Sequence, residues 1–288
     1  MDHPPDRQIK CLGTGVDHVN TWPYVNGLLT ACSAGTDNSP STISPPEPDH
    51  YVVPEPIRQA TVVWSAEPGI ELEGWQATLI RAATESILIT DKFGLSAAYP
   101  GFKAALTSQA RNIISPPGTD DDDETREMRY ALVDPIVGTF RYHIVATVDD
   151  GKQLSGYVCA QQSGTADTGS DGKYVRHLLK PGGGLPVPLQ RLSETPLAPS
   201  LTLEADATGN PRGLSDTSEW SAPTEDVFTG WQVQFETSFN DPFEENLDEL
   251  YGKCAAWENA VYPGIPSTIS ERIIEDSPPE TLPSYPGW

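Results

Sequence analysis

The stretch TFRYHIVATVDDGKQLSGYVCA, residues 139–160, decides the fold class of this chain. In its first half, side chains suited to a core alternate with others, which is the two-residue period of a half-buried β-strand. The residues DDGK, 149–152, then supply an Asp-Gly turn, and the alternation resumes after it. The stretch therefore predicts an antiparallel hairpin, and we expect Tyr142, Ile144 and Val148 to face the core.

Weaker strand patterns occur on both sides of this hairpin. The candidate strands are residues 60–64, 70–79, 128–137, 174–179, 201–205 and 230–237. Glycine and proline between these runs favour a mainly β body, arranged as an antiparallel sandwich or a jelly roll. The tripeptide Gly-Trp-Gln occurs at 74–76 and again at 230–232. We interpret both tryptophans as core residues, with ligand stacking as the alternative.

A few short helices are expected beside the strands. Residues 74–90 fit a helix as well as a strand, because apolar residues recur there every three or four positions. A proline precedes the helix-forming run at 101–113, which suits a helix start. Residues 246–261 also show one apolar helical face, although Gly252 weakens that prediction.

Proline-rich segments flank the body at both ends. We divide the chain into an extended amino-terminal arm (1–59), a β-rich body (60–261) and an extended carboxy-terminal arm (262–288). Proline removes a backbone donor, and a segment with few apolar side chains cannot offset its own ordering entropy. We therefore expect both arms to dock on neighbouring molecules. The side chains expected to make these contacts are Trp288, Tyr285, Ile273, Ile274 and Tyr51.

Acidic residues outnumber basic ones, 41 against 18, which gives a formal net charge of −23. This charge disfavours direct binding to nucleic acids and to anionic membranes, because both are negatively charged. A solubility-driven or halophilic surface explains such a charge, and a partner with a basic patch, or a cation at a chain interface, is the functional alternative. No run of 18 apolar residues occurs, and the first residues, MDHPPDRQ, lack the features of a signal peptide.

The four cysteines, Cys11, Cys32, Cys159 and Cys254, are widely spaced and form no CxxC pair. This spacing argues against a zinc site. Cys11 and Cys32 could pair if the amino-terminal segment folds back. Since nothing at the start indicates Sec export, we expect the cysteines to be reduced.

The tetrapeptide DTGS at 167–170 resembles the catalytic loop of aspartic proteases, in which two aspartates meet and activate water. Its flanks here are polar and the chain holds no second copy, so the sequence favours a surface loop. The acidic run at 120–124, and Asp167 with Asp171, are candidate cation sites. A contiguous run does not arrange carboxylates around one point, however, so a solvated loop is favoured.

These patterns favour a structural subunit of a large assembly, not an enzyme. A viral particle is the most specific form of this hypothesis, with the chain in the virion as a capsid, cement or vertex-associated protein. Its partners would be copies of itself or other subunits held by exchanged arms, with no cofactor and no metal. A binding module for a glycan or a receptor is the alternative, and a divergent aspartic-type hydrolase is the third.

Overall fold

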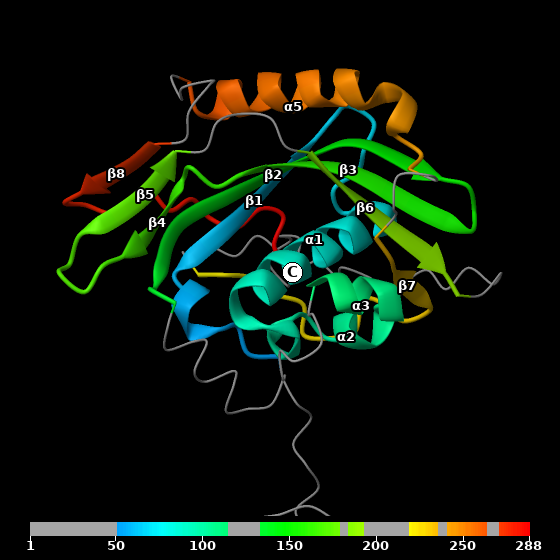
Figure 1. Ribbon diagram of the computed structural model, residues 1–288, viewed down its shortest axis with the longest axis horizontal. Coiled ribbons are helices and arrows are strands. Elements are labelled where there is room, and N and C mark those ends of the chain that lie inside the picture. Colours follow the sequence, from blue (N-terminus) through cyan, green and yellow to red (C-terminus); the bar gives the residue numbers. More distant parts are fainter. Residues whose placement is uncertain (1–50, 115–132, 179–183, 193–218, 236–240, 264–270) are drawn as a thin grey trace, which may run out of the picture. The chain divides into compact units, whose positions relative to one another are not determined.

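The computed structural model describes residues 51–114, 133–178, 184–192, 219–235, 241–263 and 271–288, and the statements below concern these residues (Figure 1). The chain divides into two units, Met1–Pro46 and Glu47–Trp288, and the described residues all belong to the second. The candidate strand at 201–205, the acidic run at 120–124 and residues 1–50 of the expected arm lie outside the described residues.

The described elements are η1 (Glu55–Ile57), β1 (Ala60–Ala66), α1 (Trp75–Phe93), η2 (Leu95–Ala97), α2 (Phe102–Ala105), α3 (Ser108–Ile114), β2 (Ile136–Asp149), β3 (Gln153–Gln161), β4 (Thr165–Thr168), β5 (Tyr174–Leu178), β6 (Gly184–Arg191), β7 (Trp231–Val233), η3 (Glu244–Asn246), α5 (Leu247–Val261) and β8 (Glu271–Glu275). The sheet order is β7-β6-β3-β2-β4-β5-β8, and β1 pairs with β2 beside this path. The β1–β2 pair is parallel and the other pairs are antiparallel.

The mainly β class is confirmed. In the part of the chain that the structure describes, however, the strands form one sheet, not the two facing sheets of a sandwich or jelly roll. Helices take the place of a second sheet: α1 lies against one face and α5 lies along the other (Figure 1). We call these the α1 face and the α5 face.

The predicted hairpin at 139–160 is confirmed as β2 and β3, which pair antiparallel. Tyr142 and Ile144 are buried, whereas Val148 is 40% exposed, so its expected place in the core is wrong. The cause is a β-bulge, because the register shifts between Ile144 and Ala146. An extra residue in one strand reverses which of the following side chains face each side of the sheet.

The structure confirms some of the other predicted strands and not others. Strands at 60–64 and 174–178 are confirmed as β1 and β5. Of the candidate strand at 230–237, residues 231–233 form β7, residues 234 and 235 are not strand, and residues 236 and 237 lie outside the described ranges. Before the hairpin, no separate strand occurs at 133–135, and β2 itself begins at Ile136.

Helix α1 replaces the strand predicted at 70–79 and confirms the helical alternative for 74–90. It contains neither proline nor glycine, and it ends at Gly94, whose φ of 87° suits a residue without a side chain. The helix packs closely on the sheet: a methyl group at Gly156 of β3 would lie 2.6 Å from Ile80 Cδ1.

The helix predicted at 101–113 is present as two short pieces, α2 and α3. The break falls near Thr107, whose N–H donates to the carbonyl of Val233 at 3.0 Å. The Thr107 hydroxyl then accepts from the N–H of Ala110 at 3.1 Å and caps α3. The helix predicted at 246–261 is confirmed as α5.

The part of the expected carboxy-terminal arm (262–288) from residue 271 onward packs on the body of its own chain. Strand β8 pairs with β5. Farther along, the N–H of Tyr285 donates to Val62 at 3.0 Å, and its carbonyl accepts from the N–H of Trp64 at 2.6 Å. Strand β1 pairs with β2 along one edge, which leaves the backbone N–H and C=O groups of its other edge without a strand partner. The segment around Tyr285 forms hydrogen bonds with these groups.

Cys159 of β3 and Cys254 of α5 form a disulfide, with their Cα atoms 5.4 Å apart. The expectation of reduced cysteines is therefore wrong for this pair. The two residues are 95 positions apart and meet only through the fold, so their spacing in sequence does not reveal the bond. Cys11 and Cys32 lie outside the described residues.

Within the described ranges, no helix has both the length and the apolar character needed to cross a membrane.

Candidate functional site

A cleft lies on the α1 face of the sheet and consists of two pockets that share Gln162. The α3 pocket has a volume of about 330 Å³ and the β4 pocket about 220 Å³. The α3 pocket is lined by Thr84, Ile87, Leu88, Asp91, Ile113, Ile114, Tyr142, Ala160 and Gln162. The β4 pocket is lined by Lys92, Ile136, Phe140, Gln162, Thr165, Ala166, Asp167, Val175 and His177.

Helix periodicity builds one wall of the α3 pocket. The α1 residues in this wall are three or four positions apart and share one helical face: Thr84, Ile87, Leu88 and Asp91. Helix α3 supplies two further apolar side chains, and one of them, Ile113, is 53% exposed. Burial raises the pKa of the Tyr142 phenol far above its ordinary value. Tyr142 therefore stays protonated and presents a neutral hydroxyl.

The β4 pocket combines an apolar floor with several polar groups. Ile136 and Phe140 are four positions apart on β2 and share one face of the strand. His177 Nε2 lies 3.7 Å from Asp167 Oδ2, so these two side chains form a pair when the imidazole is protonated. Lys92, from the last turn of α1, is half-buried and forms no ion pair with a residue that the structure describes.

A buried carboxylate lies on the same face and has a structural role. Glu85 accepts hydrogen bonds from Trp64 Nε1 at 2.7 Å, from the Tyr99 hydroxyl at 2.5 Å and from Trp288 Nε1 at 3.1 Å. Burial raises the pKa of the Glu85 carboxyl, and Arg81, one helical turn away, opposes that shift. The pKa of Arg81 is itself lowered by burial. The network ties α1 to β1 and to the end of the chain.

The side chains predicted to contact neighbouring molecules fall into two groups. Tyr51 and Trp288 contact the same buried ring, that of Tyr99, with centroid distances of 5.3 and 5.8 Å. Trp288 also lies under the Arg81 guanidinium, whose carbon is 4.5 Å from the ring centroid. Tyr51 and Trp288 are thus engaged within their own chain.

The remaining predicted contact residues are more open. Ile274 of β8 is 61% exposed and Tyr285 is 45% exposed, while Ile273 is half-buried. The structure does not bring Ile273 and Ile274 together with the Tyr51–Trp288 group, since β8 lies at the β5 end of the sheet (Figure 1).

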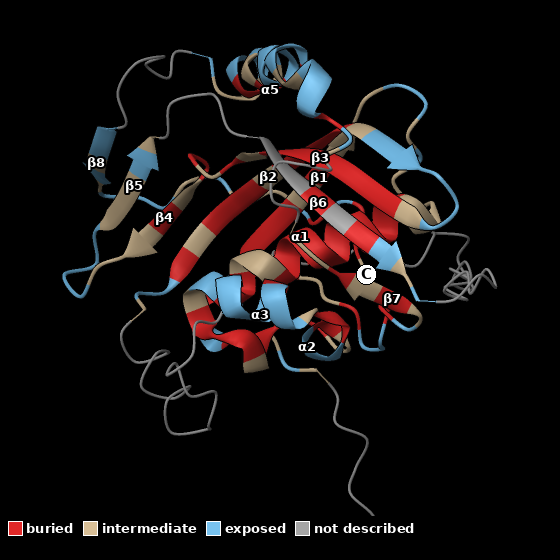
Figure 2. Cartoon of the chain, turned by 45° about the vertical axis from the view of Figure 1, so that its right-hand side comes forward, coloured by how far each residue is buried: buried red, intermediate tan, exposed pale blue. Residues whose placement is uncertain are grey.

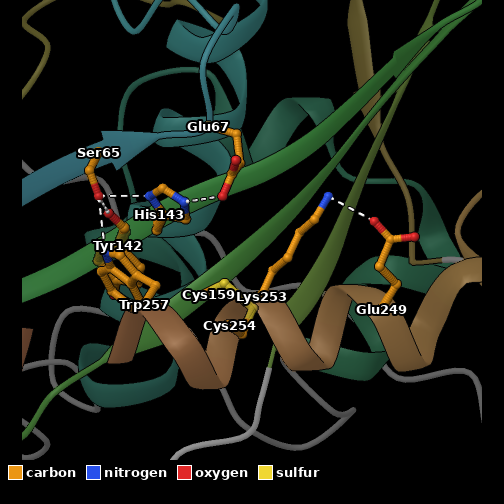
Figure 3. A network of polar contacts seen from close by, with 9 residues as sticks. All are labelled: Ser65, Glu67, Tyr142, His143, Cys159, Glu249, Lys253, Cys254 and Trp257. Carbon is orange, nitrogen blue, oxygen red and sulfur yellow. Dashed lines mark hydrogen bonds and ion pairs between the residues drawn. A yellow bond between two sulfur atoms is a disulfide. The ribbon is translucent and has the colours of Figure 1, made fainter. Parts of the chain in front are cut away.

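A second polar network lies on the α5 face, where helix α5 meets the sheet (Figure 3). Ser65 Oγ is 2.8 Å from His143 Nδ1, and His143 Nε2 is 3.4 Å from Glu67 Oε1. Burial lowers the pKa of His143. A hydroxyl, an imidazole and a carboxylate in this order are the parts used for acyl transfer.

Trp257 of α5 blocks that chemistry in this arrangement. Its indole N–H donates to Ser65 Oγ at 3.1 Å, and its ring stacks on the His143 ring at a centroid distance of 5.3 Å. Neither pocket of the cleft is lined by these residues. We therefore interpret the network as a satisfied contact between α5 and the sheet.

The two Gly-Trp-Gln copies meet in the fold. The rings of Trp75 and Trp231 have centroids 5.6 Å apart, and the Arg191 guanidinium lies 5.0 Å from the Trp231 centroid and 5.8 Å from the Trp75 centroid. Trp231 belongs to the main core and Trp75 packs against it, which agrees with their interpretation as core residues.

The cation and protease hypotheses gain no support in the described ranges. These ranges hold no group of three or more His, Cys, Asp and Glu residues suited to a metal ion. Asp167 of the DTGS tetrapeptide lies in β4 opposite Val175, and Asp171 accepts from the N–H of Lys173 at 3.0 Å in the following turn.

Sequence reasoning missed the cleft. The repeated spacing of 84, 87, 88 and 91 was a usable signal for a helical face, but the strand alternative obscured it. Lys92, Gln162 and His177 come from three distant positions that only the fold unites. No protein family, no curated protein and no solved structure matches the chain significantly.

Proposed function

We propose that the chain is a binding module whose ligand occupies the cleft on the α1 face. The observation that carries this proposal is the pair of adjoining pockets, about 330 and 220 Å³, with largely apolar walls and a few polar groups. Pockets for small molecules have this composition and volumes of about 300–1,000 Å³, a range that the α3 pocket reaches alone and the β4 pocket only together with it. A receptor or glycan, the earlier expectation for a binding module, would instead need an open aromatic surface.

The proposal involves binding without turnover. Ser65 and His143 lie under α5 and not in the cleft, so the pockets contain no hydroxyl with an adjacent base of that kind. Asp167 and His177 are half-exposed and line the β4 pocket as polar contacts.

A neutral apolar fluorophore, N-phenyl-1-naphthylamine, tests the proposal. We expect saturable binding to the full chain and at least about tenfold weaker binding to Ile113→Asp, since a charge in the α3 pocket opposes an apolar ligand. Ile274→Asp is the matched control, because Ile274 is similarly exposed but lies on β8. No saturable binding, or equal weakening by both substitutions, would contradict the proposal.

A subunit of a large assembly is a second proposal, and exposed apolar side chains outside the cleft favour it. Val52 is 80% exposed, Ile274 61% and Tyr285 45%. Contacts with copies of the chain would therefore use these side chains and not an exchanged carboxy-terminal arm. Light scattering of the full chain tests this second proposal. Assemblies that the Ile274→Asp variant no longer forms would support a structural subunit, in a virion or in another assembly. A monomer at all concentrations would contradict it.

A further inference from the structure

We propose that the ligand is a single-chain amphiphile with a carboxylate head, which Lys92 binds in the β4 pocket while the apolar chain fills the α3 pocket. This inference rests on the proposed binding function and names its ligand class. Its basis is the position of Lys92 in the β4 pocket and the aliphatic side chains of the α3 pocket, two pockets that share Gln162.

The position of Lys92 is the first argument. In a chain with 41 acidic and 18 basic residues, a lysine has many potential partners. Lys173 and Lys253 do pair, with Asp276 and Glu249. Lys92 is half-buried beside an apolar floor and has no such partner among the described residues. An ammonium group in that setting is stabilised by an anion that enters the pocket.

The balance of donors and acceptors is the second argument. Lys92 donates only, and the Gln162 side chain offers an amide NH₂. Asp167 Oδ2 lies 3.7 Å from His177 Nε2, and the Thr165 hydroxyl donates to the Gln162 carbonyl at 2.9 Å. The Lys92 ammonium group and the Gln162 amide are therefore the donors in this pocket that a head group rich in acceptors would satisfy.

Nearby carboxylates limit the charge of that head group. Asp91 is exposed where α1 borders the α3 pocket, and Asp167 lines the β4 pocket. Together with the net charge of −23 they oppose a dianion such as a phosphate monoester. One carboxylate charge matches the Lys92 ammonium group, which has no ion-pair partner among the described residues.

The apolar chain has a matching wall in the α3 pocket. Ile87 and Leu88 of α1 line it together with Ile113 and Ile114 of α3, and Ala160 contributes from the sheet. An alkyl chain in this pocket would remove apolar surface from water on both partners, which is the main source of affinity for such ligands.

Competition against the neutral fluorophore tests the head group with three probes of equal chain length: dodecanoate, dodecanol and dodecylammonium, each below its micelle concentration. We expect dodecanoate to bind about tenfold more tightly than dodecanol, because a charge-assisted hydrogen bond exceeds a neutral one. Lys92→Met should abolish this preference without weakening dodecanol. Lys152→Met, in the exposed hairpin turn, is the matched control and should retain the preference.

The outcomes separate the two proposals. Equal binding of the three probes, or tightest binding of dodecylammonium, would overturn the carboxylate assignment and leave the binding module standing. A carboxylate preference that survives Lys92→Met would overturn the role of Lys92. Fluorophore binding that none of the probes displaces would contradict the proposed ligand class, whereas no fluorophore binding at all would contradict the binding module itself.

Discussion

Helix α1 and helix α5 cover opposite faces of one sheet, but different forces hold them there. Thirteen of the 19 residues of α1 are buried, against three of the 15 residues of α5. Figure 2 shows the contrast, with α1 largely in the colour of buried residues and α5 largely in that of exposed ones. Extensive burial and a polar network secure α1, whereas α5 rests on a small cluster, one disulfide and the contacts of Trp257 with Ser65 and His143.

The comparison teaches where this protein tolerates change. A helix secured by burial responds to small changes in volume, because protein interiors are close-packed. A helix with few buried residues and one covalent link responds to loss of that link and tolerates substitutions along its exposed surface. The predictions below test this difference, beginning with the largest expected effect.

Removal of the buried carboxylate should be the most damaging single change on the α1 face. Glu85→Ala leaves Trp64, Tyr99 and Trp288 without their acceptor and leaves Arg81 buried without its counter-charge. We expect a loss of about 3–5 kcal/mol in the free energy of unfolding, measured in urea. Glu249→Ala on α5 is the control and should cost under about 1 kcal/mol, since its pair with Lys253 is exposed.

Loss of the disulfide should be the most damaging change on the α5 face. Cys254→Ala removes a link between residues 95 positions apart, and we expect a loss of about 2–5 kcal/mol in the free energy of unfolding. A reducing agent should destabilise the wild type equally and have no further effect on the variant. If reduction leaves the urea midpoint unchanged, then packing alone holds α5 and the contrast between the faces is wrong.

Two glycine-to-alanine substitutions, one on each face, should change the free energy of unfolding in opposite directions. At Gly156 an added methyl would lie 2.6 Å from Ile80 Cδ1, and we expect about 1–3 kcal/mol of destabilisation from overpacking. At Gly252, within α5, an added methyl meets nothing within 4 Å. There we expect stabilisation of about 0.5–1 kcal/mol, because alanine favours the helix. The same sign at both positions would contradict the comparison.

The smallest effect concerns pH and the α5 face. Burial lowers the pKa of His143 below its ordinary value, so at mildly acidic pH the unfolded chain binds a proton that the folded chain does not. Stability from this residue is therefore present above about pH 6.5, the ordinary pKa of histidine, and is lost as the pH falls below it. In urea titrations from pH 8 to pH 5, His143→Gln should show a shallower decline than the wild type. A parallel decline would mean that other groups cause it.

Several features were predictable because their signals are local. The hairpin at 139–160 combines a two-residue period with an Asp-Gly turn, and helix α5 shows its apolar face in sequence. Only part of the cleft could be predicted. Its α1 wall follows from the helical spacing of apolar residues, but the same residues also fitted a strand. Lys92 and His177 carried no local signal, since a lysine at the end of a helix and a histidine in a strand are ordinary.

The sequence by itself determined the mainly β class, the hairpin turn and the helical nature of α5, because backbone geometry and side-chain period act over a few residues. The tertiary structure decided the rest: one sheet in place of two, the bulge that turns Val148 outward, and the partner of Cys159. It also decided that Trp288 inserts beside Glu85 in its own chain. Each of these depends on contacts between distant segments, and a proline-rich segment has the same composition whether it docks on a neighbour or on itself.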